Sequence, residues 1–538
     1  MAGLFGGLSA FVLNTSFSIP FLTACLALLL CLILFAFTGW NSRPLLLPPE
    51  KKSPKVYLWI TAGLTLGFFL FVSIWTVSRV HSFSTPTYDF GIFSQMFYNM
   101  KESGLPITTV ERDGALSHLL VHMSPIYYLM LPFYMLFPTP ATLQVLQAAV
   151  IASSVIPLWL IGKHHGLSGL QRTLTCAVLL LYPALSGGTS YDIHENCFLA
   201  PLLLWLLYGI DRRNSPITAL SALLTLSVKE DAAVYVGIVA VYLILKTLLH
   251  HKKLDRKNLI TGCVLLIASL VWFFTVTDFL ATSGDGVMTY RYNNFIYDKS
   301  TSLVTVIKAV IMNPMKVIYE CVDPEKLEFI GLTLLPLIGL PFLTRRFERF
   351  CLLIPYILVN LMSDYQYQHD IFFQYTFGAT ACLIYLSVIN LAELKLNWQR
   401  IMLLATAVII SATLFSANIV PKATYYTQLC GRYGTYYDNV RSTLDKIPED
   451  ASVSATTFYT THLSQRQVLY DIRYASTQHI LSTEYVAINI HADSCLKKYA
   501  YGGKNNGYEN FIKLLEQNGY TLFAELPGTL VIYHKPAT

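Results

Sequence analysis

Long apolar runs separated by short polar segments fill the first 420 residues of the chain. A helix needs about 20 apolar residues to cross a bilayer, and the pattern predicts a multi-pass helical bundle with about 11–13 spans. Some runs are shorter, which is typical of broken helices or of helices beside a polar cavity. The candidate spans are residues 19–39, 57–78, 139–162, 170–185, 197–210, 215–228, 232–249, 258–281, 328–344, 349–363, 371–393 and 401–420.

The pattern changes after residue 420, where charged residues return and short alternating runs appear. Three strand-like runs, a helix and a hairpin that turns at Pro527-Gly528 predict a small α/β domain. These elements are Ala451–Phe458, Gln467–Ile472, Tyr485–Ile490, the helix Tyr508–Asn518, and the hairpin strands Tyr520–Leu526 and Thr529–His534. We therefore expect an N-terminal span with a cytoplasmic linker (1–52), a polytopic domain (53–420) and the α/β domain (421–538).

Basic residues predict the orientation of the bundle, because Lys and Arg concentrate in cytoplasmic loops. Placing the basic loops in the cytoplasm puts the C-terminal domain on the extracytoplasmic side of the membrane. The opposite side also receives segments 79–124, 186–196, 229–231, 282–327 and 364–370. Segment 125–137 is apolar but does not fit the alternation of spans, so we expect a juxtamembrane or partly inserted helix.

The composition supports a membrane protein and argues against a nucleic-acid-binding protein. Only 13% of the residues are charged, against about 25% in soluble domains. The net charge is +6, but no basic patch interleaved with aromatic residues indicates a nucleic-acid partner. Cys430 and Cys495 both lie in the tail and would be able to pair outside the cell, although their spacing does not decide whether they do.

Ionisable residues are scarce and expensive near a membrane, so their positions indicate function. On the predicted outer side they gather at the ends of spans. The clusters are Asp89, His118 and His122, Asp192 with His194 and Glu195, Lys229-Glu230-Asp231, and His369-Asp370. We expect the loops that carry them to converge on one pocket at the outer lipid boundary.

Each cluster has a functional interpretation and a structural alternative. Asp89 is a candidate general base or metal ligand, or else the N-cap of a helix over 91–101. His118 and His122 have helical i, i+4 spacing but lack the glutamate of a HExxH zinc motif, so we expect His122 to contact substrate or a carboxylate.

The second group of clusters is weighed in the same way. The Asp192–Glu195 segment suits a cation or phosphate contact, or is a solvated turn. Lys229 suits a phosphate, at the tip of a helical hairpin whose turn lacks the usual Gly or Pro. The polar and aromatic loop 282–327 is either a gate over a cavity or a packed loop.

Several of these motifs together are similar to a known family. The strings YDFGIFSQMFYN, HMSPIYYLMLPFYMLFPTP, YDIHE and VKED resemble a bacterial family of polytopic membrane proteins that is classed as a domain of unknown function and grouped with the GT-C glycosyltransferases. The resemblance runs from about Ser53 to Leu391. It implies a helical membrane fold with an extracytoplasmic active site, and an acidic residue in the first large outer loop, which Asp89 matches. Tyr88 stands where some relatives carry a second acid.

The resemblance implies transfer of a sugar from a polyprenyl-phosphate donor in the bilayer to an extracytoplasmic acceptor. We expect catalytic roles for Asp89, Asp192 and Glu230. The residues expected to bind substrate are His122, His194, Lys229, Asp231 and His369. The sequence does not decide whether the reaction uses a divalent cation. The alternatives are a transporter or flippase of a lipid-linked or anionic substrate, and a scaffold whose tail binds a partner.

Overall fold

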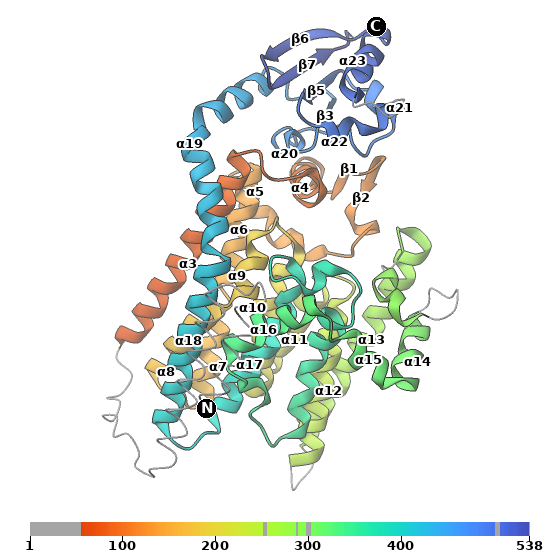
Figure 1. Ribbon diagram of the computed structural model, residues 1–538. Helices are drawn as coiled ribbons and strands as arrows, with labels where there is room; N and C mark the ends of the chain where they lie inside the picture. The colour runs from red at the N-terminus through yellow and green to blue at the C-terminus, as the bar shows by residue number, and fades with distance from the viewer. Residues whose placement is uncertain (1–54, 251–254, 287–288, 297–302, 501–505, 537–538) are drawn as a thin grey trace.

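The computed structural model describes residues 55–250, 255–286, 289–296, 303–500 and 506–536. A helical bundle forms its lower part and a small sheet domain stands above it (Figure 1). Six of the described helices or helix runs are long and apolar enough to cross a membrane, or seven if the pair Gly169–Leu180 and Pro183–Ser190, bent by 44°, forms one span. The expected span 19–39 lies outside the described residues.

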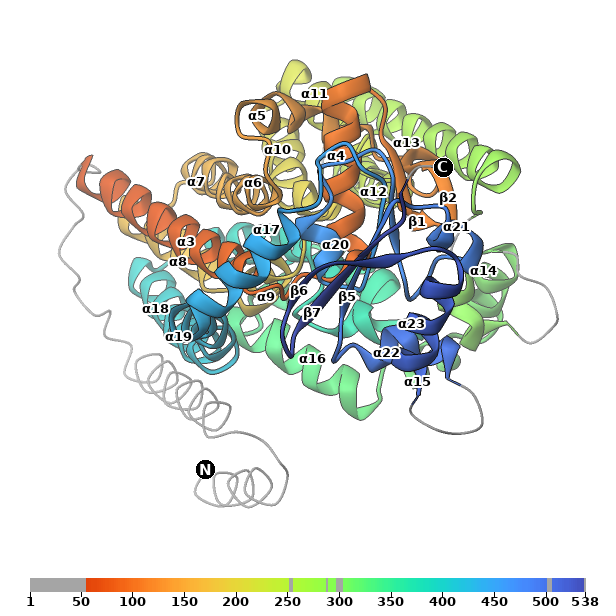
Figure 2. The ribbon, with the colours of Figure 1, turned by 90° about the horizontal axis from the view of Figure 1, so that it is seen from above.

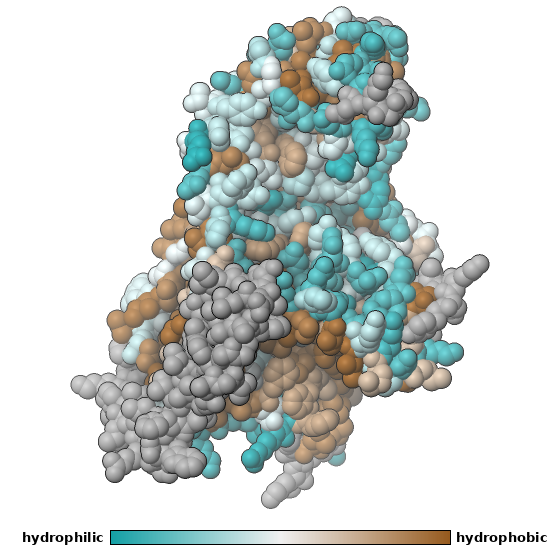
Figure 3. All heavy atoms as spheres, in the orientation of Figure 1, coloured by the Kyte–Doolittle hydropathy of each residue, from teal (hydrophilic) through white to brown (hydrophobic). Residues whose placement is uncertain are grey.

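The main helices of the bundle follow the apolar runs of the sequence, and shorter helices fill the space between the long ones. They are α3 (Lys55–His81), α6 (Pro140–Ala152), α7 (Val155–His164), α8 (Gly169–Leu180), α9 (Pro183–Ser190), α10 (Leu199–Asp211), α11 (Ser215–Leu226), α12 (Ala232–His250), α13 (Arg256–Ser283), α17 (Phe377–Ala392) and α18 (Asn397–Asn418). Apolar side chains cover much of the lower surface, and polar ones prevail above (Figure 3).

Two expected spans, 328–344 and 349–363, are not continuous helices. The helix α16 (Pro324–Leu334) is followed by short 3₁₀ segments at Leu335–Leu337, Leu340–Phe342 and Phe347–Leu353 and a π segment at Tyr356–Leu361. Ile338 and Gly339 have φ of 47° and 74°, which a right-handed helix cannot include, and prolines interrupt the backbone hydrogen bonds. The sequence correctly predicted two apolar segments here, but it did not predict that their helices are broken.

Short elements lie between the bundle and the sheet domain. They are the π turn Thr87–Gly91, α4 (Ile92–Ser103), the hairpin β1 (Ile107–Arg112) and β2 (Gly114–Ser117), 3₁₀ turns at His118–Leu120 and Pro125–Leu129, and α5 (Leu131–Leu136). Segment 125–137 is thus short and carries exposed apolar side chains such as Phe133, Leu136 and Phe137, as a helix at the membrane boundary would. Loop 282–327 contains a 3₁₀ segment at Thr289–Phe295, α14 (Leu303–Met312) and α15 (Pro314–Glu320).

The C-terminal domain confirms the predicted strands and hairpin. Helix α19 (Val420–Leu444) continues upward from α18 and leads into a mixed five-stranded sheet of order β4-β3-β5-β7-β6. Its strands are β3 (Val453–Ala455), β4 (Leu469–Asp471), β5 (Tyr485–Asn489), β6 (Thr521–Leu526) and β7 (Leu530–His534). Strand β3 pairs in parallel with β4 and β5, whereas β7 is antiparallel to β5 and β6.

Four short helices complete this domain: α20 (Tyr459–His462), α21 (Thr477–Leu481), α22 (Asp493–Leu496) and α23 (Gly507–Gln517). Its apolar core includes Ile92 of α4 and Val110 of β1, and seen from above the sheet lies over the bundle (Figure 2). Cys430 and Cys495 are free thiols with different partners, Ser78 and Thr457, so the structure does not contain the disulfide considered from the sequence. The sheet domain is thus packed on the segments that surround Asp89.

Candidate functional site at the upper face of the bundle

Asp89 occupies a strained position between α3 and α4. Its φ and ψ are 74° and −74°, and such a conformation costs a non-glycine residue about 1–3 kcal/mol and is found most often at functional sites. The N-cap of α4 is Gly91, which makes no side-chain cap bond. Capping therefore does not explain Asp89, and the structural alternative considered for it is wrong.

The C-terminal domain holds the residues just before Asp89. The Thr87 hydroxyl donates to the buried carboxylate of Asp471, and it lies 2.6 Å from the Thr460 hydroxyl. Asp471 also accepts from Thr457 at 2.7 Å, and the Tyr88 ring packs edge-on against Tyr474 at 4.3 Å. The strained turn is thus fixed by residues almost 400 positions further along the chain.

The Asp89 carboxylate faces a tyrosine and a histidine. The Tyr191 hydroxyl donates to Oδ2 at 2.7 Å, and His194 Nε2 lies 3.3 Å from Oδ1. The Asp89 side chain is 32% exposed, against 7% for His194. His194 Nδ1 lies 3.0 Å from the carbonyl oxygen of Asp192, so both ring nitrogens face oxygen atoms and the charged imidazolium is favoured.

The pKa directions agree with this geometry. Burial opposes charge on both groups, but the attraction between them outweighs it. The pKa of Asp89 is held below its usual value, mainly by His194, and the pKa of His194 is raised, mainly by Asp89. Asp89 is therefore an ionised, partly accessible carboxylate that is able to accept a hydrogen bond from a hydroxyl.

Asp192 lies deeper than Asp89 and is fully buried. Its Oδ1 accepts from Arg79 at 2.9 Å and from Gln144 at 3.1 Å, while Arg79 also donates to the carbonyl of Ser190 at 2.6 Å. The Asp192 side chain has 0% exposure. This ion pair ties the end of α3 to the segment that carries His194, and the carboxylate has no open path to a substrate.

Lys229 belongs to a second buried ion pair beside His194. Its ammonium lies 3.0 Å from Glu195 Oε1, and Glu195 Oε2 accepts from the Tyr127 hydroxyl at 2.8 Å. The two charged side chains are 7% and 0% exposed. As predicted, residues 229–231 lie at the tip of a helical hairpin, between α11 and α12. Lys229 is already neutralised there, so it is not a free cation.

Two histidines in the segment that follows β2 lie in the same region. His122 Nδ1 lies 2.9 Å from Glu230 Oε1, and His118 Nδ1 lies 3.0 Å from both Glu111 oxygens. Each of the two therefore pairs with a carboxylate, one of the outcomes expected for His122. The Phe93 ring contacts both His118 and His194, at 5.3 and 5.1 Å between centroids, which packs the two sets of charges into one site.

An arginine that the sequence left among the loop residues also reaches the site. The Arg291 Nη2 donates to the Tyr375 hydroxyl at 3.2 Å, and its guanidinium stacks on the rings of Tyr365 and Tyr375 at 4.7 and 5.0 Å. Asp231 is half-buried, and desolvation raises its pKa in spite of the nearby charges of Lys229 and Arg291. Arg291 is partly exposed, so it is a cation that a ligand is able to reach.

His369 is separate from these groups. Its ring is almost buried and lies 3.8 Å from Glu325 of α16, with Lys326 and Asp323 as further charged neighbours. Among the described residues, no group of three or more His, Cys, Asp or Glu side chains is arranged to hold a metal ion. The structure therefore brings together the predicted clusters from four loops and leaves His369 outside.

Of the residues that the sequence analysis did not single out, Arg79 and Tyr191 had a visible signal. Arg79 is a lone basic residue at the outer end of a span, against the orientation rule, and Tyr191 directly precedes the Asp192 cluster. Thr87 and Asp471 had no such signal in the sequence, because nothing in either segment indicates that the two residues are in contact.

The comparisons with known proteins agree with the fold. A model of the predicted membrane proteins called DUF2079 matches residues 79–531. The chain belongs to this family. Among solved structures, it is similar to ArnT from Cupriavidus metallidurans bound to undecaprenyl phosphate, with 12% identity, a TM-score of 0.55 and coverage of 90% of this chain and 99% of ArnT. The chain therefore has an ArnT-like fold.

A second solved structure is the arabinofuranosyltransferase AftD from Mycobacteria, with 12% identity, a TM-score of 0.49 and coverage of 91% of this chain and 40% of AftD. No curated protein matches this DUF2079 chain.

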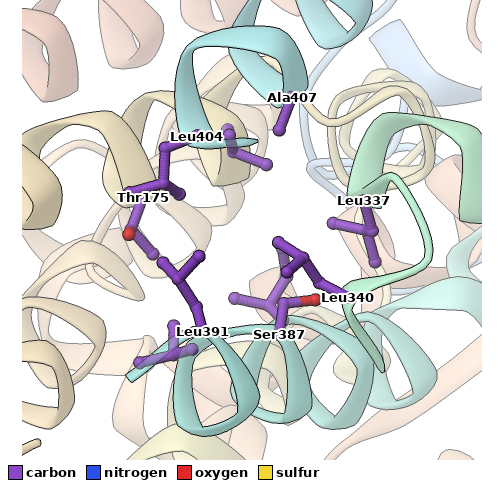
Figure 4. Close-up of a pocket in the computed structure, with 10 residues that line it drawn as sticks. Thr175, Leu337, Leu340, Ser387, Leu391, Leu404 and Ala407 are labelled. Carbon is purple, nitrogen blue, oxygen red and sulfur yellow. The ribbon is translucent and has the colours of Figure 1, made fainter. Parts of the chain in front are cut away.

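A small cavity elsewhere in the bundle does not extend the site. It has a volume of about 20 Å³ and lies between α8, α17 and α18, lined by apolar side chains with Thr175 and Ser387 among them (Figure 4). That volume holds about one water molecule. It is a packing gap and not a space for a lipid chain.

Proposed function

We propose that this DUF2079 protein is a membrane glycosyltransferase that transfers a sugar from a polyprenyl-phosphate donor to an acceptor hydroxyl. The observation that carries the proposal is the ionised, partly exposed and strained carboxylate of Asp89 in an ArnT-like fold. The related structure of ArnT is described as bound to undecaprenyl phosphate. We place the site on the extracytoplasmic side of a bacterial plasma membrane, because the basic loops lie at the other end of the bundle.

In this reaction the acceptor oxygen attacks the anomeric carbon of the donor sugar. The bond between that carbon and the phosphate oxygen breaks, and the proton of the acceptor hydroxyl moves to Asp89. Polyprenyl phosphate leaves with the bonding electron pair. General base catalysis by a positioned carboxylate contributes about 10²–10⁴-fold to such a rate.

The other predicted residues divide into those that would contact the phosphate and those that would hold the site in place. Arg291 and the imidazolium of His194 would stabilise the phosphate as its charge develops. Lys229, Glu230 and His122 would position the site through their ion pairs, since little of Lys229 or Glu230 is exposed. We assign Asp231 a supporting role through its charge, which is influenced by Lys229 and Arg291. We assign Asp192 the same supporting role, in place of the catalytic one expected from sequence, and His369 no direct one.

The test measures undecaprenyl phosphate released from a panel of radiolabelled undecaprenyl-phosphate sugars by the full chain in nanodiscs. We expect Asp89→Asn to lower release by at least about 10²-fold and Asp89→Glu to retain part of it. Glu102→Gln is the matched control, because this carboxylate is exposed and pairs with the partly exposed Lys101. Full activity of Asp89→Asn would refute the role of the base. Passage of intact labelled donor across vesicles without cleavage would favour the transporter.

A further inference from the structure

A larger cavity lies on the other side of the segment that leads to Asp89. It has a volume of about 510 Å³ and is enclosed by the end of α3, the turn before α6, the end of α19 and α20. Small-molecule sites typically have volumes of about 300–1,000 Å³. None of the groups of the Asp89 site lines it, so it is a separate space between the bundle and the C-terminal domain.

Two phenylalanines in strained conformations line this cavity. Phe83 has a φ of 50° and Phe458 a φ of 76°, in a region that side chains with a Cβ atom seldom adopt. Phe83 packs against Tyr459 and His462 at 5.7 and 5.4 Å. Phe458 in contrast is 43% exposed. Strain of this kind persists where the fold holds it for a purpose, and ligand clamps are a common one.

The polar groups of the cavity are balanced in charge. His462 Nε2 lies 3.0 Å from Asp445 Oδ1, and Arg441 donates to His81 Nδ1 at 3.0 Å. Two arginines, Arg441 and Arg466, are matched by two carboxylates, Asp445 and Glu449. A phosphate or another anion would gain little from this lining, and a lipid chain would leave these charges buried without water.

We propose that this cavity binds a neutral saccharide. A sugar ring presents C–H faces that pack on an aromatic ring, and hydroxyl groups that both donate and accept hydrogen bonds. Phe458 supplies the aromatic face, and the Asp445–His462 pair supplies acceptor and donor atoms at the rim. The inference does not depend on the transferase proposal; if both hold, the saccharide bound here is the glycan acceptor or product.

The site is also connected to Asp89 through α20, which directly follows Phe458. Thr461 of this helix donates to the carbonyl of Thr85 at 3.1 Å, and Thr460 contacts Thr87 at 2.6 Å. A saccharide that contacts Phe458 therefore acts on a segment that is hydrogen-bonded to the turn carrying Asp89.

The test is direct binding of fluorescent neutral oligosaccharides, three to six sugars long and free or lipid-linked, to the full chain in nanodiscs. We expect Phe458→Gly to weaken binding at least tenfold while keeping or raising the melting temperature, because glycine relieves the backbone strain. Phe458→Tyr should retain binding. Phe523→Ala removes another exposed aromatic ring of the same domain and should leave binding unchanged.

Three results would overturn the inference: no neutral oligosaccharide binds, Phe458→Gly binds as tightly as the parent chain, or undecaprenyl phosphate competes for the site. Binding of the lipid-linked probes alone, with no competition from undecaprenyl phosphate, would support the site and identify a membrane-anchored glycan as its ligand. Saccharide binding without any release of undecaprenyl phosphate would sustain this inference while the transferase proposal fails. Release of undecaprenyl phosphate without saccharide binding at this cavity would sustain the transferase proposal while this inference fails.

Discussion

The ion pair between Lys229 and Glu195 gives a prediction whose size follows from burial. Lys229→Met keeps an apolar stem of similar length and removes the ammonium. The Glu195 carboxylate, with 0% exposure, is then left with the Tyr127 hydroxyl as its nearest hydrogen-bond donor, at 2.8 Å. Removing one partner of a buried ion pair costs about 3–5 kcal/mol. We expect a loss of that size in the free energy of unfolding, measured by SDS titration in mixed micelles.

Two further variants make the measurement decisive. Glu195→Gln added to Lys229→Met removes the stranded charge, so most of the loss should be recovered. Lys101→Met breaks the exposed pair with Glu102, whose side chains are 31% and 44% exposed, and should cost at most about 1 kcal/mol. If Lys229→Met costs no more than Lys101→Met, or if the double variant is less stable than the single one, the pair is not an isolated buried charge pair as argued.

Three other predictions use the same purified chain. Asp471→Asn leaves a buried network of hydroxyl donors imperfectly paired, so it should cost about 1–3 kcal/mol and lower kcat for undecaprenyl phosphate release more than it raises KM; an unchanged kcat would contradict its positioning role. Gly187→Ala places a Cβ atom in steric conflict with the carbonyl oxygen of Ile371, so thermal melting should show a loss of about 1–3 kcal/mol in the free energy of unfolding. The pKa of His194 is raised beside Asp89, so the parent chain should be more stable than His194→Gln. This difference in the free energy of unfolding should be complete below about pH 6.5 and should fall as the pH rises through the raised pKa. A difference that grows with pH would refute the charged pair.

Much of this architecture could be predicted from the sequence, because it depends on local patterns. Apolar runs predict membrane helices whatever they pack against, and alternation with a Pro-Gly turn predicts a hairpin such as β6–β7. The scarcity of charge in the chain also made Asp89, His194 and Lys229 visible. These predictions need only near neighbours in the chain.

The features that the sequence could not predict depend on contacts between distant segments. Lys229 was expected to bind phosphate, but its charge is used by Glu195, which only the folded chain shows. Asp192 was expected to be catalytic as one of three ionisable residues within four positions at the end of a span, yet Arg79 and Gln144 bury it. A cluster of ionisable residues in the sequence thus identifies a site, while burial decides which member of it a substrate is able to reach.

The hydrogen bond between Thr87 and Asp471 makes the sheet domain part of the support of Asp89. Asp89 holds a left-handed conformation that an isolated loop would abandon, because about 1–3 kcal/mol of strain exceeds the thermal energy. The bundle fixes the far side of the carboxylate through Tyr191 and His194. The near side is fixed through Thr87 by the domain above. Asp89 is therefore held by both parts of the chain, and each part without the other would leave it unsupported on one side.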